Sequence, residues 1–217
     1  RYASRGLGDV YKRQFKNKAF NGFLQLKDQF IDLKFNGNID FNSQPKEFDF
    51  SLAISNAYLG ELGLLSYSPK SKLSFVSYFN GFGNDWKDFT GFVNLESIYF
   101  YHNNTTHDFG SIQFNSQTNE SDHLIKLRSD ILSFDINGEF NFDELYTNFK
   151  YSVNRIIPNI FSNVNSVNKD QLFEFDLTVH DFQPINTLLH NNIDIAPNSF
   201  LKLRFSKKDN LSDFELK

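Results

Sequence analysis

Residues 131–142 read ILSFDINGEFNF and alternate apolar with polar side chains around a central Asn-Gly pair. A matching stretch, FIDLKFNGNIDF, occupies residues 30–41 much earlier in the chain. When the two are aligned on their glycines, their apolar positions coincide: Ile131/Phe30, Leu132/Ile31, Phe134/Leu33, Ile136/Phe35, Phe140/Ile39 and Phe142/Phe41. A period of two is typical of strands that bury one face. Both stretches are therefore predicted to be half-buried strands.

The Asn-Gly pair at the centre of each stretch favours a hairpin. A three-residue turn at 137–139 would pair Ile136 with Phe140. It would also pair Phe134 with Phe142, so that all four side chains point to one face. Glycine provides the positive φ that such a turn requires. A straight strand through the glycine would also place these side chains on one face, but we predict the hairpin.

The first residues need a separate interpretation. Residues 4–14, SRGLGDVYKRQ, are what results when a common transposon-adapter sequence used in library preparation is translated, and every codon fits. We interpret residues 1–14 as such an artefact, in preference to a natural basic arm. The genuine chain is then expected to be residues 15–217, an internal fragment open at both ends.

Composition excludes several classes of function. The net charge is −4 with both signs mixed along the chain, so there is no basic stripe for nucleic acid to bind. The chain has no cysteine for disulfides or thiolate chemistry. No apolar run is long enough for a transmembrane helix. The 27 phenylalanines sit mostly at alternate positions, which indicates strands with one apolar and one wet face.

Alternation along the whole chain predicts roughly a dozen strands, among them residues 47–55 and 172–179. Residues 72–80 alternate less cleanly because Phe75 and Val76 are both apolar. The predicted fold class is mostly β: a long, curved, antiparallel-rich sheet rolled into an open trough with short helical insertions. A β-sandwich is the alternative, because so long a sheet normally curls or splits.

One substantial helix is predicted at residues 143–157. Asp143 is a plausible N-cap, and Pro158 ends the helix. Shorter helical segments are expected within residues 57–65 and around residues 184–189.

The order of these elements resembles a known family. Residues 32–41 (DLKFNGNIDF), 45–50 (PKEFDF) and 56–59 (NAYL) are similar to the TamB translocation and assembly proteins of Bacteroidetes-type bacteria, in the AsmA-like superfamily. The similarity continues through residues 125–132 (IKLRSDIL) and the helix that ends in Ile-Ile-Pro. It covers residues 18–217 and rests on the order of the elements.

The resemblance implies a trough with an apolar interior, called a β-taco, and no catalytic residues. Proteins of the family are anchored in the inner membrane by an N-terminal helix and span the periplasm towards an Omp85-class outer-membrane protein. Transport of phospholipid between membranes and insertion of outer-membrane proteins are attributed to them. The chain is accordingly expected to be a periplasmic portion of such a protein in a Gram-negative bacterium, without the anchor and the partner-binding region.

The expected inner face is wholly apolar, which suits a phospholipid acyl chain and not a head group. A dozen strands about 4.8 Å apart would form a trough roughly 55 Å long. The candidate lipid-groove residues are Phe35, Ile39, Phe41, Phe48, Phe50, Leu52, Ile54, Phe134, Ile136, Phe140, Phe142, Phe173, Phe175, Leu177 and Val179.

Other chemistry has little support in the sequence. His102, His107 and Asp108 share a polar loop but have no further spaced ligand, so we expect no metal site. No Ser/His/Asp set has a suggestive context, and neither an enzyme nor a cofactor is predicted. The alternative function is a structural or adhesive β-sandwich repeat of a surface protein, in which the same phenylalanines would form a closed core.

Overall fold

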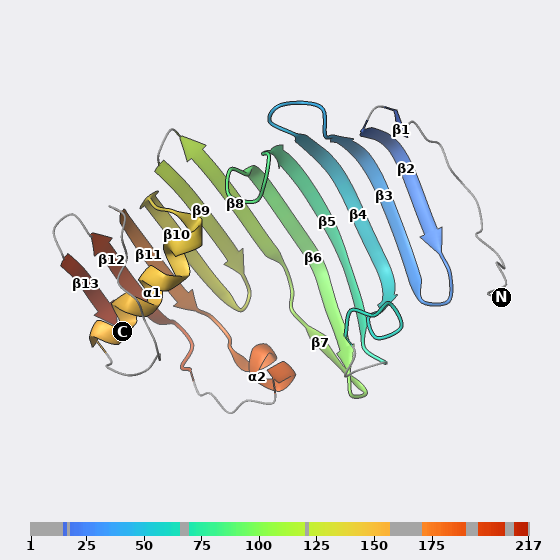
Figure 1. Cartoon of the computed structure of the whole chain (residues 1–217). Coiled ribbons are helices and arrows are strands. Elements are labelled where there is room, and N and C mark those ends of the chain that lie inside the picture. The colour runs from blue at the N-terminus through green and yellow to red at the C-terminus, as the bar shows by residue number, and fades with distance from the viewer. Residues whose placement is uncertain are drawn as a thin grey trace.

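A computed structural model describes residues 15–16, 18–65, 70–119, 122–156, 171–189, 195–206 and 211–216. One antiparallel sheet of 13 strands dominates these residues (Figure 1). The strands are hydrogen-bonded in chain order, and only the short strand β7 lies off the path, paired with β6. Strands β1 and β13 are the two ends of this order, so the sheet is open. The predicted long antiparallel sheet is confirmed, and the described residues contain no second sheet to make a sandwich.

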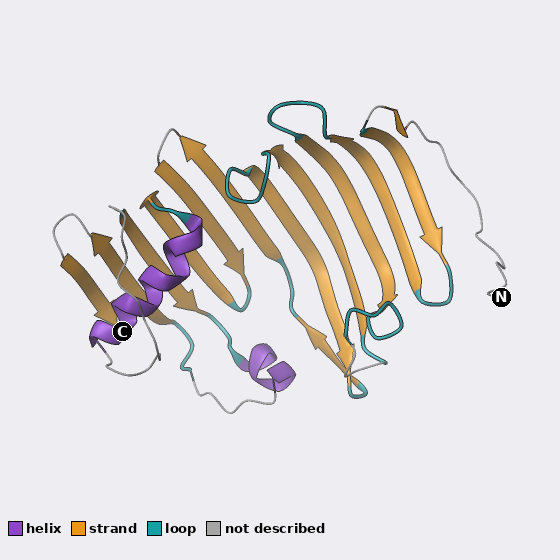
Figure 2. Cartoon of the chain, in the orientation of Figure 1, coloured by secondary structure: helices purple, strands orange, loops and turns teal. Residues whose placement is uncertain are grey.

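The strands are β1 (Phe15–Lys16), β2 (Ala19–Lys27), β3 (Ile31–Asp40), β4 (Glu47–Tyr58), β5 (Lys72–Phe82), β6 (Thr90–His102), β7 (Thr105–Asp108), β8 (Ile112–Asn119), β9 (Asp122–Ser129), β10 (Leu132–Glu139), β11 (Leu172–Val179), β12 (Ser199–Ser206) and β13 (Leu211–Leu216). The helices are α1 (Phe142–Ile156) and α2 (Gln183–Leu189). Figure 2 shows α1 lying across the C-terminal strands, whereas the same face of β2 to β6 carries no helix.

The two Asn-Gly motifs do not form hairpins. Gly37 lies within β3 and Gly138 within β10, and each strand continues straight through its glycine. Ile136 pairs with Ile125 of β9 on one side and with Phe175 of β11 on the other. The predicted hairpin is therefore wrong, although the straight strand leaves the apolar side chains on one face as expected.

The glycines are required by the close approach of neighbouring strands. Gly138 has a φ of +133°, and a Cβ placed there would lie 2.2 Å from the carbonyl oxygen of Leu172. Gly37 has a φ of +149°, and its Cβ would lie 2.3 Å from the carbonyl oxygen of Asp49. Only glycine fits both the conformation and the space.

Strand β5 keeps a regular alternation: Phe75 lies on the apolar face, whereas Val76 is 47% exposed on the opposite face. The β5–β6 register shift between Ser74 and Val76 advances two residues along β5 and three along β6, so the bulge belongs to β6. Strand β6 is one irregular strand, in which Ser97 has a φ of +54°. Past the bulge, Phe100 packs against Ala57 and partly buried neighbours. Residues 57–65, expected to be helical, instead extend β4 and then form turns.

Helix α1 covers one end of the apolar face. Its N-cap is Asn141, whose side-chain oxygen accepts a hydrogen bond from the Asp143 amide at 2.9 Å. The predicted cap, Asp143, lies instead within the first turn, where with Glu144 it complements the helix dipole. The predicted end at Pro158 lies outside the described residues. The short helix expected near residue 184 is α2, which begins at Gln183.

Candidate functional site

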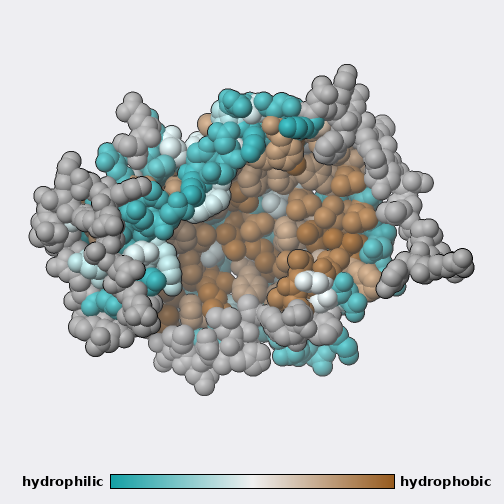
Figure 3. All heavy atoms as spheres, viewed as in Figure 1, coloured by the Kyte–Doolittle hydropathy of each residue, from teal (hydrophilic) through white to brown (hydrophobic). Residues whose placement is uncertain are grey.

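Cross-strand register collects a row of phenylalanine rings on one face of β2 to β5 and of the loop that follows β5. Successive ring centroids are 5.3, 5.1, 5.0 and 5.1 Å apart along Phe20, Phe35, Phe50, Phe79 and Phe89. Each ring is only half-buried. Figure 3 shows the result as a hollowed hydrophobic surface, which we call the open groove.

The predicted groove residues fall into two groups. Those of β3 and β4 line the open groove: Phe35, Ile39, Phe48, Phe50, Leu52 and Ile54. At its rim, Phe41 is 47% exposed and contacts Phe48, with the ring centroids 6.1 Å apart.

The second group comes from β10, β11, the short connection after β10 and the start of α1: Phe134, Ile136, Phe140, Phe142, Phe173, Phe175, Leu177 and Val179. Register places the strand residues on the same face as the first group, for example Phe134 opposite Leu177. However, Ile136, Phe140, Phe173 and Val179 are buried. With exposures of 2–7%, these four side chains are packed against their neighbours, unlike the half-buried rings of the open groove.

Helix α1 closes this second region. Leu145 and Tyr151 of the helix pack against a buried cluster that includes Phe173 and Leu203, which are 2% and 0% exposed. A polar network fixes the helix to the start of β11. The Gln171 side-chain amide donates to the Glu144 carboxylate at 2.7 Å and accepts a hydrogen bond from the buried Asn148. We call the strands beneath α1 the covered region.

The opposite face of the sheet carries the ion pairs that join neighbouring strands, including Lys27–Asp32, Arg128–Asp135, Lys202–Asp176 and Arg204–Glu174. It is not uniformly polar, because Val76, Tyr78 and Phe82 of β5 are exposed there.

Sequence reasoning did not assign the loop at residues 83–89, between β5 and β6, to the site. The Asp88 carboxylate accepts hydrogen bonds from the backbone amides of Asp85 and Asn84, at 2.9 and 2.8 Å. These bonds hold the pKa of Asp88 below its usual value. Because the loop satisfies its polar groups internally, it presents Trp86 and Phe89 to the apolar face.

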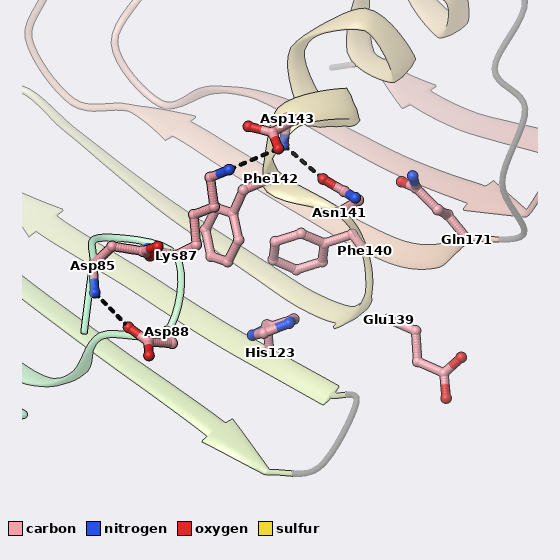
Figure 4. Close-up of a pocket in the computed structure, with 10 residues that line it drawn as sticks. All are labelled: Asp85, Lys87, Asp88, His123, Glu139, Phe140, Asn141, Phe142, Asp143 and Gln171. Carbon is pink, nitrogen blue, oxygen red and sulfur yellow. Dashed lines mark hydrogen bonds and ion pairs between the residues drawn. The ribbon is translucent and has the colours of Figure 1, made fainter. Parts of the chain in front are cut away.

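The same loop reaches the covered region. The Trp86 ring meets Phe142 edge-on, with centroids 5.1 Å apart. Lys87 donates to the Asp143 carboxylate at 2.7 Å, which raises the pKa of Lys87 (Figure 4). Nearby, His123 packs against both Phe140 and Phe142, and burial lowers its pKa. These residues line a polar pocket of about 600 Å³ between the loop and the helix.

Beneath the loop lies a second pocket of about 440 Å³, with an almost wholly apolar lining. Its lining includes Phe48, Phe79, Trp86, Phe89, Val93 and Phe114. Only Phe48 was predicted from the sequence. Apolar residues on both faces of β5, with Val76 and Tyr78 exposed on the opposite face, obscured the alternation that leads to Phe79. No local pattern indicates that Trp86 folds over the sheet.

Neither a cluster of possible metal ligands nor a helix fit to span a membrane is found in the described parts of the chain. No group of three or more His, Cys, Asp or Glu side chains there could hold a metal ion. His102 instead bonds to the Ser71 hydroxyl at 2.8 Å and stacks on Phe100. Neither described helix combines the length and the apolar composition needed to cross a bilayer.

Comparison of the chain with protein-family models, with curated proteins and with solved structures found no significant match.

Proposed function

We propose that the chain is a segment of a TamB/AsmA-like cell-envelope protein and that its open groove holds phospholipid acyl chains. The observation that carries the proposal is the row from Phe20 to Phe89, half-exposed on a concave face that no described helix covers. Its function would be phospholipid transport between membranes, assembly of outer-membrane proteins, or both.

The energetics favour an alkyl chain as the occupant. Large contiguous apolar patches on soluble proteins usually mark binding sites. Removing a methylene group from water contributes about 0.8 kcal/mol, so half-shielding ten of them contributes roughly 4 kcal/mol. The five rings of the row are all phenylalanine and nearly evenly spaced. A chain could therefore shift along the row at similar free energy, as transport requires.

The proposed cellular setting follows from the sequence resemblance. The protein would be anchored in the inner membrane, cross the periplasm of a Gram-negative bacterium and engage an Omp85-class partner through regions outside these residues. The charged opposite face suits an aqueous compartment.

Native mass spectrometry with lipid extraction tests the proposal. The variant Phe50→Asn places an amide in the open groove, whereas Phe82→Asn makes the same change on the opposite face of the sheet, where Phe82 is 46% exposed. We expect phospholipid to co-purify with the unchanged chain and with Phe82→Asn, and to be largely lost from Phe50→Asn.

Circular dichroism would establish that both variants fold. Two outcomes would contradict the proposal: a folded, lipid-free chain, or equal lipid retention by both variants. A lipid-free dimer would indicate that a second copy of the chain covers the groove.

A further inference from the structure

The pocket beneath the loop at residues 83–89 differs from the rest of the open groove because the loop covers it; we call the loop the roof and the pocket the roofed pocket. We propose that the roofed pocket holds the end of one acyl chain of a diacyl phospholipid at a fixed position, which we call the fixed seat. The inference rests on the proposed function and adds a defined position to it.

The pocket is built from three neighbouring strands and the loop. Cross-strand pairing sets Phe79 of β5 beside Val93 of β6, and Val93 beside Phe114 of β8, to form the floor. Trp86 and Phe89 stand at the loop side of the pocket. A volume of about 440 Å³ is within the range of about 300–1,000 Å³ for small-molecule sites.

The size of the pocket fits one alkyl chain. A methylene group is about as large as a water molecule, which occupies about 30 Å³ in the liquid. The pocket therefore takes on the order of ten to fifteen chain carbons, which is most of one acyl chain and too little for two.

The polar residues of the lining, Asn84 and Asp85, make their hydrogen bonds within the loop, where the Asp85 carboxylate accepts one from the Lys87 amide at 2.7 Å. The Asn84 amide group is bonded to the Asp88 carboxylate at 3.0 Å, and the backbone amides of Asn84 and Asp85 bond to the same carboxylate. The polar end of a ligand must therefore stay outside the roof. The open groove beyond the pocket offers a second chain the half-buried rings of Phe35 and Phe50, which favours a diacyl lipid over a free fatty acid.

The roof is held in place at several points. Phe89 lies over Gly81, where an added Cβ would come within 2.6 Å of the ring. Trp86 packs against Phe142, and Lys87 pairs with Asp143, so the loop is tied to α1. A chain end beneath this loop would be held at one position, unlike a chain on the uniform row of rings.

Trp86 allows a direct test because it is the only tryptophan in the chain and is 64% exposed. The probes are phosphatidylcholines that carry a nitroxide either near the methyl end or near the carboxyl end of one acyl chain. We expect the methyl-end label to quench Trp86 fluorescence at least about twice as strongly as the carboxyl-end label. This comparison uses the unchanged 217-residue chain, so it does not depend on any variant folding.

A matched pair of variants sharpens the test. Val93→Phe fills the floor of the pocket, whereas Val76→Phe adds the same bulk to a 47% exposed position on the opposite face. We expect Val93→Phe to abolish the dependence on label position and to weaken binding about tenfold, equivalent to losing contact with about two methylene groups. Val76→Phe should behave like the unchanged chain.

The outcomes separate this inference from the proposed function. If lipid is retained but both labels quench equally, or if Val93→Phe changes nothing, the fixed seat is refuted, whereas the proposal that the open groove binds lipid is not. If nitroxide-labelled fatty acid binds more tightly than the phospholipid, the assigned occupant is wrong. If no lipid is retained at all, the inference and the proposed function fail together.

Discussion

The open groove and the covered region share the same alternating sequence pattern but differ in how deeply their apolar side chains are buried. Phe35 in β3 and Ile136 in β10 occupy equivalent positions in the two matching stretches, yet Phe35 is half-buried and Ile136 is 7% exposed. The difference lies in the segment that comes after each strand. Helix α1 comes after β10 and folds back over the sheet, whereas an exposed polar connection comes after β3. Alternation thus sets which face is apolar, but the next element decides whether that face is sealed.

We expect the covered region to contribute mainly to stability and the open groove mainly to binding. The covered region and the helix above it contain Leu203 and Asn148, which are both at 0% exposure. The open groove leaves its rings accessible and is expected to contribute less to folding for each phenylalanine. Mutations should therefore separate the two regions.

The largest contrast should come from phenylalanine truncation. Phe173→Ala removes a 2% exposed ring from the covered region and should lower the free energy of unfolding by about 3–5 kcal/mol. Phe35→Ala removes a half-buried ring from the open groove and should lower it by only about 1–2 kcal/mol. Urea denaturation of both variants measures the difference, and equal losses would mean that the groove is covered as well.

Glycine replacement should instead affect the two regions alike. Gly138→Ala and Gly37→Ala each force alanine into a positive φ and against a neighbouring backbone. Each should destabilise the fold by at least about 2 kcal/mol, because the strain arises within the sheet and not from its cover. A loss confined to Gly138→Ala, measured in the same denaturation experiment, would show that the cover matters at this position too.

A smaller effect is expected from the network that holds α1 in place. Asn148→Ala leaves the Gln171 side-chain oxygen without its Asn148 donor and should cost about 1–3 kcal/mol. Tyr146, on the same helix, is 66% exposed, so Tyr146→Ala should change stability by no more than about 0.5 kcal/mol. Thermal denaturation of the two variants compares them; similar shifts would argue against a network that anchors the helix.

The smallest effect should be a pH dependence of the bridging loop. Since folding lowers the pKa of Asp88 below 3.8, its contribution to loop stability is present above that value and is lost as the pH falls through the lowered pKa. Trp86 emission should therefore shift in this acidic range, and Asp88→Asn should remove the shift. An unchanged acid transition in the variant would assign it to other groups.

Much of the sheet could be predicted because alternation is local. Strand β11 matches the prediction at both ends, and the start of α1 lies one residue from the predicted boundary. The hairpin prediction failed because Asn-Gly is a strong turn signal. A straight strand would place the same apolar side chains on one face, so the alternation does not distinguish the two structures. The partners of β10 lie in β9 and β11, and the motif itself does not encode them.

The candidate site was harder to predict because it depends on contacts between distant segments. Whether Phe140 lines a groove or joins a core depends on where α1 packs, which strand periodicity does not specify. The contact of Trp86 with Phe142 likewise joins a loop to a helix far along the chain. Val76 and Tyr78, which are exposed on the opposite face of β5, concealed the alternation that leads to Phe79, the ring that links the groove to the roofed pocket.

Photo-crosslinking in cells tests the central claim most directly. The photoreactive amino acid benzoylphenylalanine would replace Phe50 in the open groove or Phe82 on the opposite face of the sheet. The account predicts a phospholipid adduct at position 50 and none at position 82. Equal adducts at both positions, no lipid at position 50, or a crosslink there to a second copy of the chain would contradict it.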